Sequence, residues 1–465
     1  MVKIPPFLLP LLPLCLLLCF SLLHRADASG TVDGSEHWGY VQVRPRAHMF
    51  WWHYRSPHRI ENDSSPWPTV LWLQGGPGGS GVGFGNFFEI GPLDNNLKLR
   101  SSTWLRKADL LFVDNPVGTG YSFVEDTGLF VTSDEEAAID LTTLLKKLYN
   151  KHESLQKSPL YIVAESYGGK FAATVGVSVV KAVKAGELKL KLGGVVLGDS
   201  WISPEDFVLS WGPLLLDVSR LDKNGAENSN SLAEKITVQL KKGLNRDAER
   251  TWGELEDFIA SNSNNVDFYN FLQDDDSSGS ITTVGSYEES FARRYSRYLS
   301  IKAASSSSSS SSGNLHDLMN GAIKEKLKII PKNVSWGAQS DDVFDALRSD
   351  FMKPRIKEVD ELLSQGVNVT IYNGQLDLIC ATRGTEAWVQ KLKWDGLTDF
   401  TGANRKALYC DGNEAGATKG FVKSHKNLHF YWILGAGHFV PVDQPCIALK
   451  MLGDITHSPA TASSH

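Results

Sequence analysis

The sequence predicts an α/β fold in which a mostly parallel central sheet is flanked by helices. Short apolar segments, typical of buried strands, alternate along the chain with segments whose apolar residues recur at helical spacing. Strands that alternate with helices in this way favour a parallel sheet covered on both faces. The clearest example is residues 160–184, where an apolar strand, an abrupt turn and a helix follow one another.

Length and composition limit the class of protein. The chain has 465 residues, of which 42% are hydrophobic and 22% charged, enough for one large domain or two modest ones. A net charge of -6 and a pI near 6.1 provide no basic field for nucleic acid. The Cys and His residues do not pair at zinc-type spacing. We therefore expect no nucleic-acid partner, no metal and no cofactor.

Residues 1–28 have the features of a secretory signal peptide. Lys3 precedes a leucine-rich apolar run at 7–23, and Ala26-Asp27-Ala28 places small residues where signal peptidase requires them. The alternative, a retained membrane anchor, is disfavoured because two prolines interrupt a short run. We expect cleavage after Ala28 and no membrane anchor in the mature protein, which leaves a secreted, vacuolar or lysosomal destination open.

In the secretory pathway, sequons can be glycosylated and cysteines can form disulfides. Three sequons, at Asn62, Asn333 and Asn368, become candidate glycosylation sites. Once the signal is removed, three cysteines remain, at 380, 410 and 446. An odd number permits at most one internal disulfide and leaves at least one thiol.

The strands and helices can be assigned in order. Residues 38–54 are rich in aromatic and β-branched residues and predict an antiparallel hairpin at the sheet edge. Ser133, with Glu136 three residues later, predicts the capping box of a helix. Further strands are expected at 69–73, 108–114, 157–163, 192–197, 367–372 and 429–434.

A mainly helical insertion is expected at about 204–331, where the strand pattern stops. The segments 231–244 and 286–299 are amphipathic with helical spacing. We interpret the insertion as a cap over the sheet, within a single domain spanning 29–465. Residues 304–313 contain an unbroken serine run, too polar to pack, which predicts a flexible loop and a hypothetical site of proteolytic cleavage.

A glycine-rich segment, 74–81, follows the strand at 69–73 directly. So much glycine is explained if backbone N–H groups must approach another group closely. An oxyanion hole has that need, because preorganised donors must meet the charge that develops on a substrate oxygen. A phosphate-binding loop is the alternative, but no Lys-Ser or Lys-Thr pair closes the run.

Three polar residues each follow a predicted strand. Ser166 lies at the turn between strand and helix, with Gly168 and Gly169 after it, which is the pattern of a nucleophile elbow. Asp377 and His438 follow the strands at 367–372 and 429–434. The order Ser, Asp, His is that of α/β-hydrolase triads, in which the histidine takes the serine proton and the aspartate stabilises the imidazolium. The sequence thus predicts an α/β-hydrolase fold with this triad.

Five strings together resemble the serine carboxypeptidase family: LWLQGGPGGSG, NPVGTGYSF, AESYGGK, YNGQLDLIC and GAGHFVPVDQP, spread over residues 71–445. Within that family the sequence is most similar to the retinoid-inducible type and its plant serine carboxypeptidase-like relatives, because Gln-Leu precedes Asp377. The resemblance implies an exopeptidase that acts on peptide or protein C-termini. Dimers occur in the family, so a homodimer is one expected assembly.

The resemblance also implies roles for particular residues. Ser166, Asp377 and His438 would be the triad, and the backbone N–H groups of Gly76 and Tyr167 the oxyanion hole. Trp72, Gln74, Gly75 and Glu165 match the residues that bind the terminal carboxylate in the family. Gln74 replaces the usual asparagine, and Gly79 replaces a cysteine that commonly forms a disulfide.

Glu165 would repel a substrate carboxylate if it were ionised. If burial raises its pKa, the protonated form donates a hydrogen bond instead. We therefore expect activity on peptides to be favoured at acidic pH.

Two other functions fit parts of the sequence. Plant members of the family include acyltransferases that use glucose esters, and an alcohol could resolve the same acyl-enzyme. A secreted glycoprotein that uses a hydrolase fold only for binding or protection is the second alternative. The complete Ser, Asp and His set disfavours it.

Overall fold

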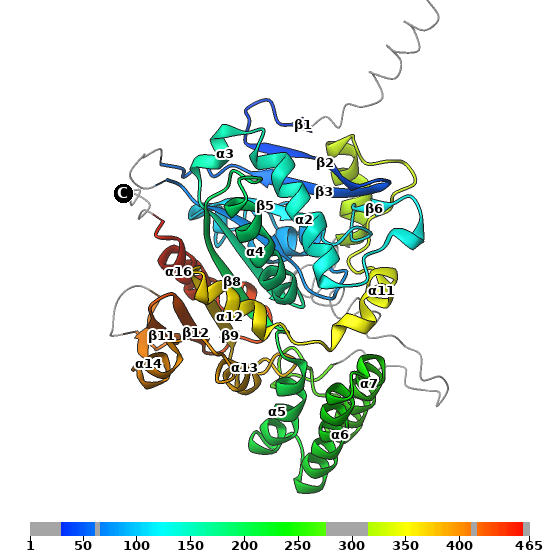
Figure 1. Ribbon diagram of the computed structural model, residues 1–465, viewed down its shortest axis with the longest axis vertical. Coiled ribbons are helices and arrows are strands. Elements are labelled where there is room, and N and C mark those ends of the chain that lie inside the picture. The colour runs from blue at the N-terminus through cyan, green and yellow to red at the C-terminus, as the bar shows by residue number, and fades with distance from the viewer. Residues whose placement is uncertain (1–28, 61–65, 276–314, 411–415, 459–465) are drawn as a thin grey trace, which may run out of the picture.

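The computed structural model describes residues 29–60, 66–275, 315–410 and 416–458 (Figure 1). The predicted signal peptide, the sequon at Asn62, the amphipathic segment at 286–299 and the serine run at 304–313 lie outside these residues.

A twelve-stranded mixed sheet forms the centre of the molecule. Its order is β1-β2-β3-β5-β4-β7-β8-β9-β12-β11-β10, and β6 pairs with β3. The strands are β1 (Ser29–Gly30), β2 (Glu36–Arg44), β3 (Ala47–Tyr54), β4 (Thr69–Leu73), β5 (Asp109–Val113), β6 (Phe123–Val124), β7 (Leu160–Ser166), β8 (Leu192–Ser200), β9 (Val369–Gly374), β10 (Lys406–Leu408), β11 (Gly420–His425) and β12 (Leu428–Ile433).

The predicted α/β class is confirmed, with parallel pairing confined to the middle of the sheet. Strands β5, β4, β7, β8, β9 and β12 run parallel. The predicted hairpin is β2–β3, joined antiparallel to β5, and β1 lies outside it. At the other edge, β10 and β11 add antiparallel strands that the sequence analysis did not predict. Such short edge strands lack the buried apolar run that marked the central ones.

Helices α2, α4 and α12 pack together against the sheet, and α4 contacts β7 and β8 (Figure 1). The main helices and helical turns are η1 (Gly81–Ile90), α2 (Asp134–Tyr149), α3 (Glu153–Lys157), α4 (Gly168–Lys184), α11 (Asp341–Phe351), α12 (Ile356–Ser364), α13 (Thr382–Val389), α14 (Leu397–Gly402), α15 (Val440–Asp443) and α16 (Pro445–Thr456). The predicted cap of α2 is present, because Ser133 Oγ accepts from the Glu136 N–H at 3.2 Å. The Glu136 carboxylate accepts from Thr132 instead of closing the box on Ser133.

The segment at 204–331 is mainly helical where it is described, with turns at 263–275. Helices α5 (Pro204–Asp217), α6 (Lys223–Lys241) and α7 (Asn245–Asn262) stand together at one end of the molecule (Figure 1). The short elements α9 (Leu315–Leu318), η5 (Met319–Ile323) and α10 (Lys324–Leu327) follow. Helicity agrees with the prediction, whereas the role of this segment as a cap stays a prediction.

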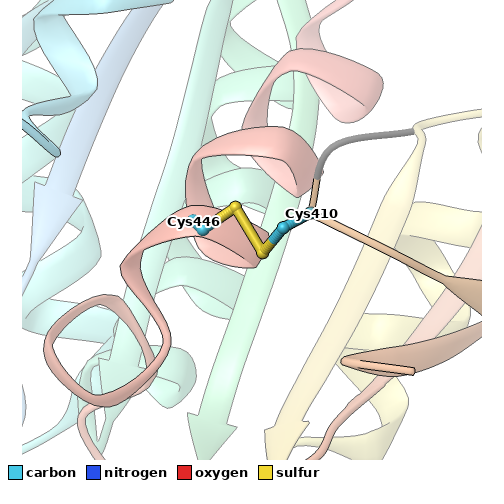
Figure 2. Close-up of a disulfide and its surroundings, with 2 residues drawn as sticks. All are labelled: Cys410 and Cys446. Carbon is cyan, nitrogen blue, oxygen red and sulfur yellow. A yellow bond between two sulfur atoms is a disulfide. The ribbon is translucent and has the colours of Figure 1, made fainter. Parts of the chain in front are cut away.

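A disulfide joins Cys410, which follows β10, to Cys446 at the start of α16 (Figure 2). It ties the antiparallel edge of the sheet to a helix. Cys380 is free and buried. The sequence allowed at most one internal disulfide and required at least one thiol, without a pairing, and the structure agrees with both limits.

Candidate active site

The three candidate triad residues lie at the carboxyl ends of neighbouring parallel strands. Ser166 is the last residue of β7, Asp377 follows β9 and His438 follows β12. Strand β8 runs between β7 and β9. The carboxyl ends of parallel strands meet at one edge of a sheet, which is where sites assemble in open α/β folds.

Ser166 has the backbone geometry of a nucleophile elbow. Its φ is +60°, a left-handed conformation that non-glycine residues seldom adopt. Helix α4 begins two residues later, at Gly168. A Cβ on Gly168 would lie 2.4 Å from the Leu73 carbonyl oxygen, so only glycine allows the helix to start this close to β4. This strained turn directs the serine side chain away from the hydrogen bonds of the sheet, as catalysis at this position requires.

Asp377 and His438 are in contact. His438 Nδ1 lies 2.9 Å from Asp377 Oδ2, and both side chains are fully buried. The Cys380 N–H donates to Asp377 Oδ1 at 3.2 Å, which fixes the carboxylate from its other side. His438 Nε2 is buried and has no hydrogen-bond partner among the described residues. Nδ1 therefore carries the proton shared with Asp377, and Nε2 is left as an acceptor for a serine or substrate proton.

The glycine-rich segment contacts the elbow. A Cβ on Gly75 would lie 2.5 Å from Ser166 Cβ and 3.0 Å from the Tyr167 backbone nitrogen. The next residue, Gly76, has a φ of +112°, which favours glycine. Because its glycines have no side chains, the backbone of this segment can lie against Ser166 and the Tyr167 N–H. The predicted oxyanion hole requires this close approach.

Three of the four residues predicted to bind the carboxylate form one hydrogen-bonded chain. The Trp72 indole Nε1–H donates to Gln74 Oε1 at 2.7 Å, and Gln74 Nε2 donates to Glu165 Oε1 at 2.9 Å. All three side chains are buried. The extra methylene of Gln74 lets its amide bridge the tryptophan and the glutamate.

Glu89, on η1, was not predicted and acts electrostatically on Glu165 of this chain. It is buried, and neither of its carboxyl oxygens has a hydrogen-bond partner among the described residues. Burial raises the pKa of Glu89 to about 7, and burial together with the Glu89 charge raises the pKa of Glu165 well above its ordinary value. The one available signal was an acid within the mostly apolar segment 81–90.

Asp377, Cys380 and His438 place three potential metal ligands within 4.8 Å of one another. The donor atoms do not suit a metal. His438 Nδ1 is occupied by Asp377. Burial and the Asp377 charge raise the pKa of the Cys380 thiol well above its ordinary value, whereas a metal ligand is a thiolate. The cluster is better suited to proton transfer.

Of the predicted sequons, Asn333 and Asn368 have exposed side chains. Both are therefore accessible to a glycosyl transferase, whereas Asn62 falls outside the described residues.

Comparison with known proteins identifies the family. The family model described as serine carboxypeptidase matches residues 27–458, nearly the whole chain. The chain belongs to the serine carboxypeptidase family. It is accordingly a serine-type carboxypeptidase, a hydrolase that acts on peptides, as the sequence analysis predicted.

Individual relatives agree with this assignment. Serine carboxypeptidase-like 51 of Arabidopsis thaliana is 63% identical over 92% of this chain and 93% of its own. The retinoid-inducible serine carboxypeptidase of Mus musculus is 48% identical over 95% of this chain and 96% of its own. The solved structure of a prohormone-processing carboxypeptidase from Saccharomyces cerevisiae covers 91% of both chains with a TM-score of 0.73 at 21% identity, which shows the fold. Within the described residues, no helix of this serine carboxypeptidase is long and apolar enough to cross a membrane.

Proposed function

We propose that this serine carboxypeptidase releases the last residue of a peptide through an acyl-enzyme formed on Ser166. The observation that carries the proposal is the buried contact between His438 Nδ1 and Asp377 Oδ2 at 2.9 Å, together with the elbow conformation of Ser166. His438 Nε2 has no hydrogen-bond partner among the described residues, so it can accept a proton.

Ser166 Oγ attacks the carbonyl carbon of the last peptide bond, and its proton passes to His438 Nε2. Asp377 stabilises the imidazolium, and the N–H groups of Gly76 and Tyr167 stabilise the oxyanion. The C–N bond then breaks, and His438 returns the proton to the departing amino acid. Water repeats the sequence on the acyl-enzyme, which releases the shortened peptide and restores Ser166.

The chain formed by Trp72, Gln74 and Glu165, together with Gly75, would bind the terminal carboxylate of the substrate. Glu165 and Glu89 are both buried, and the charge of Glu89 raises the pKa of Glu165, so they do not both ionise readily. When the pair is protonated, Glu165 donates a hydrogen bond to the substrate carboxylate. As pH rises through about 7, Glu89 loses its proton and the pair gains negative charge, which repels the substrate. Peptide hydrolysis is therefore favoured at acidic pH.

The test is release of free amino acids from N-blocked dipeptides by purified protein, from about pH 4 to about pH 8. We expect C-terminal release that is strongest at acidic pH and absent in Ser166→Ala. Labelling of Ser166 by a fluorophosphonate without release of amino acids would instead favour acyl transfer. If the protein showed no labelling and no release of amino acids, that result would contradict the proposed nucleophile.

We also propose that the protein matures in the secretory pathway. The exposed sequons at Asn333 and Asn368 and the Cys410–Cys446 disulfide suit an oxidising, glycosylating compartment. N-terminal sequencing is expected to begin after Ala28, and glycosidase treatment to lower the apparent mass. Light scattering distinguishes the proposed homodimer from a monomer, and subcellular fractionation distinguishes secreted from vacuolar or lysosomal protein.

A further inference from the structure

Asp199 lies between the strand that carries the candidate nucleophile and the strand that leads to the candidate acid. It is the next-to-last residue of β8, which pairs in parallel with β7 on one side and β9 on the other. Its side chain is fully buried, and its φ is +40°, in the left-handed region. A buried acid with strained backbone is uncommon at a purely structural position, because both features oppose folding.

One oxygen of Asp199 holds the loop that carries Asp377. Oδ1 accepts hydrogen bonds from the Gly374 N–H at 2.7 Å and from Asn373 Nδ2 at 3.1 Å. Asn373 Nδ2 also donates to the Cys380 carbonyl oxygen at 2.9 Å, and the Cys380 N–H donates to Asp377. Asp199 is therefore connected to both ends of the loop 374–380.

The other oxygen, Oδ2, receives no donor from the described residues. The nearby carboxyl group is that of Asp377, whose charge acts on Asp199. Two carboxyl groups hydrogen-bond only when one carries a proton. Asp377 already accepts from His438 and Cys380, so in such a pair the proton would belong on Asp199.

The surroundings favour the protonated state. Burial first, and then the Asp377 charge, raise the pKa of Asp199 well above its ordinary value, and Asp443 contributes in the same direction. Among the described residues, Tyr372, Cys380 and Glu165 also interact electrostatically with Asp199, and none of these three is a cation.

We propose that Asp199 is a positioning residue of the triad: as a neutral carboxylic acid it donates a hydrogen bond from Oδ2 to Asp377, while Oδ1 holds the loop that carries Asp377. The inference rests on the proposed role of Asp377. Loss of the Asp199 proton places two anions in contact, and their repulsion displaces the Asp377 carboxylate from His438. The site then loses its nucleophile at alkaline pH, independently of how the substrate carboxylate is bound.

The experiment measures the rate at which a fluorophosphonate inactivates the full-length secreted protein, from about pH 5 to about pH 9. This reagent reports on Ser166 and has no terminal carboxylate, so the titration of Glu89 and Glu165 does not affect its recognition. Asp199→Asn retains an acceptor for Gly374 and a donor for Asp377 but does not titrate. Asp199→Ala removes both. Asp140→Asn, at a buried acid on α2 that pairs with Arg44, is the matched control.

We expect the wild-type rate to fall at alkaline pH. Asp199→Asn should stay within about threefold of wild type at its best pH and lose the alkaline fall, and Asp199→Ala should be slower by about tenfold or more at every pH. Asp140→Asn should keep the wild-type profile.

An alkaline fall that persists unchanged in Asp199→Asn would overturn the proposal, and so would an Asp199→Asn variant as slow as Asp199→Ala. Wild-type rates in both variants would overturn it as well. Because the decisive variant is the isosteric one, a failure of Asp199→Ala to fold does not prevent the test. Absence of labelling in the wild type, with Ser166→Ala as reference, would instead contradict the proposed nucleophile, and with it any positioning role at this triad.

Discussion

Two clusters of buried titratable residues include residues close in sequence to Ser166, and they differ in charge balance. In the first, Lys170 and Arg355 neutralise Asp134 and Asp350, with Lys170 Nζ 3.4 Å and Arg355 Nε 2.7 Å from Asp134 Oδ2. In the second, the carboxyl groups are those of Glu89, Glu165, Asp199 and Asp377.

The two clusters therefore hold their protons differently. Burial works to raise the pKa of Asp350, but Lys170, Lys353 and Arg355 outweigh it and hold that pKa below the ordinary value. In the second cluster burial is reinforced by neighbouring carboxylates, so Glu165 and Asp199 keep protons to a pH well above their ordinary range. Burial still raises the pKa of Asp134 and lowers the pKa of Lys170, so opposite charges offset only part of the cost of burial in the first cluster. In the second cluster the carboxylates act on Glu165 and Asp199 in the same direction as burial, so the hydrogen bonding of that site changes with pH.

The largest effect on stability is expected from breaking the balanced cluster. Lys170→Met leaves Arg355 as the cation paired with the buried Asp134 and removes hydrogen bonds to the carbonyls of Asp350 and Phe351. We expect the free energy of unfolding to fall by about 3–5 kcal/mol, measured by urea denaturation. Lys146→Met, at a partly exposed lysine paired with Glu187, is the control and should change it by less than about 1 kcal/mol. Equal effects would contradict the importance of the buried pairing.

Glu89→Gln is expected to have a smaller effect on folding stability than Lys170→Met, and to increase it. The pKa of Glu89 is raised to about 7 in the folded protein against 4.5 in the unfolded chain. The folded state therefore binds this proton more tightly, and stability is lost as pH rises from about 4.5 through about 7. Glutamine does not ionise, so the variant should be more stable than wild type by about 1–3 kcal/mol at pH 8 and equal to it near pH 4.

Thermal denaturation at both pH values measures this difference. Glu227→Gln, at an exposed position, should show no such dependence. A Glu89→Gln variant whose advantage is the same at both pH values would show that Glu89 does not titrate in this range.

Tyr167→Phe is expected to have the smallest effect on the free energy of unfolding. The Tyr167 hydroxyl donates to Asp134 Oδ1 at 2.8 Å, within the balanced cluster, while its backbone N–H is the proposed oxyanion donor. Removing the hydroxyl should lower the free energy of unfolding by about 1–2 kcal/mol and leave kcat within about twofold. A loss of activity without loss of stability would indicate that the hydroxyl itself takes part in the reaction.

The two clusters also differ in how far the sequence predicts them. Ser166, Asp377 and His438 were recognisable because each directly follows a strand, and parallel strands bring their carboxyl ends together. Trp72, Gln74 and Glu165 were assigned through the family resemblance, and the structure joins them in one hydrogen-bonded chain.

Glu89 and Asp199 could not be assigned in the same way. Each is a single acid in an apolar or glycine-containing run, and its partner lies far along the chain, so its state depends on contacts that exist only after folding. The balanced cluster was missed for the same reason, because Arg355 and Lys170 come from different elements. The central strands were predictable from their apolar runs, whereas β10 and β11 are short, partly exposed and lack that signal.

The most direct test of the account compares a peptide that has a free C-terminal carboxylate with the same peptide amidated, as the ratio of their kcat/KM values from about pH 4 to about pH 8. The proposed carboxyl pair predicts a strong preference for the free carboxylate at acidic pH, which declines as pH rises through the pKa of Glu89, about 7. A ratio that does not change with pH would contradict recognition of the substrate by protonated glutamates.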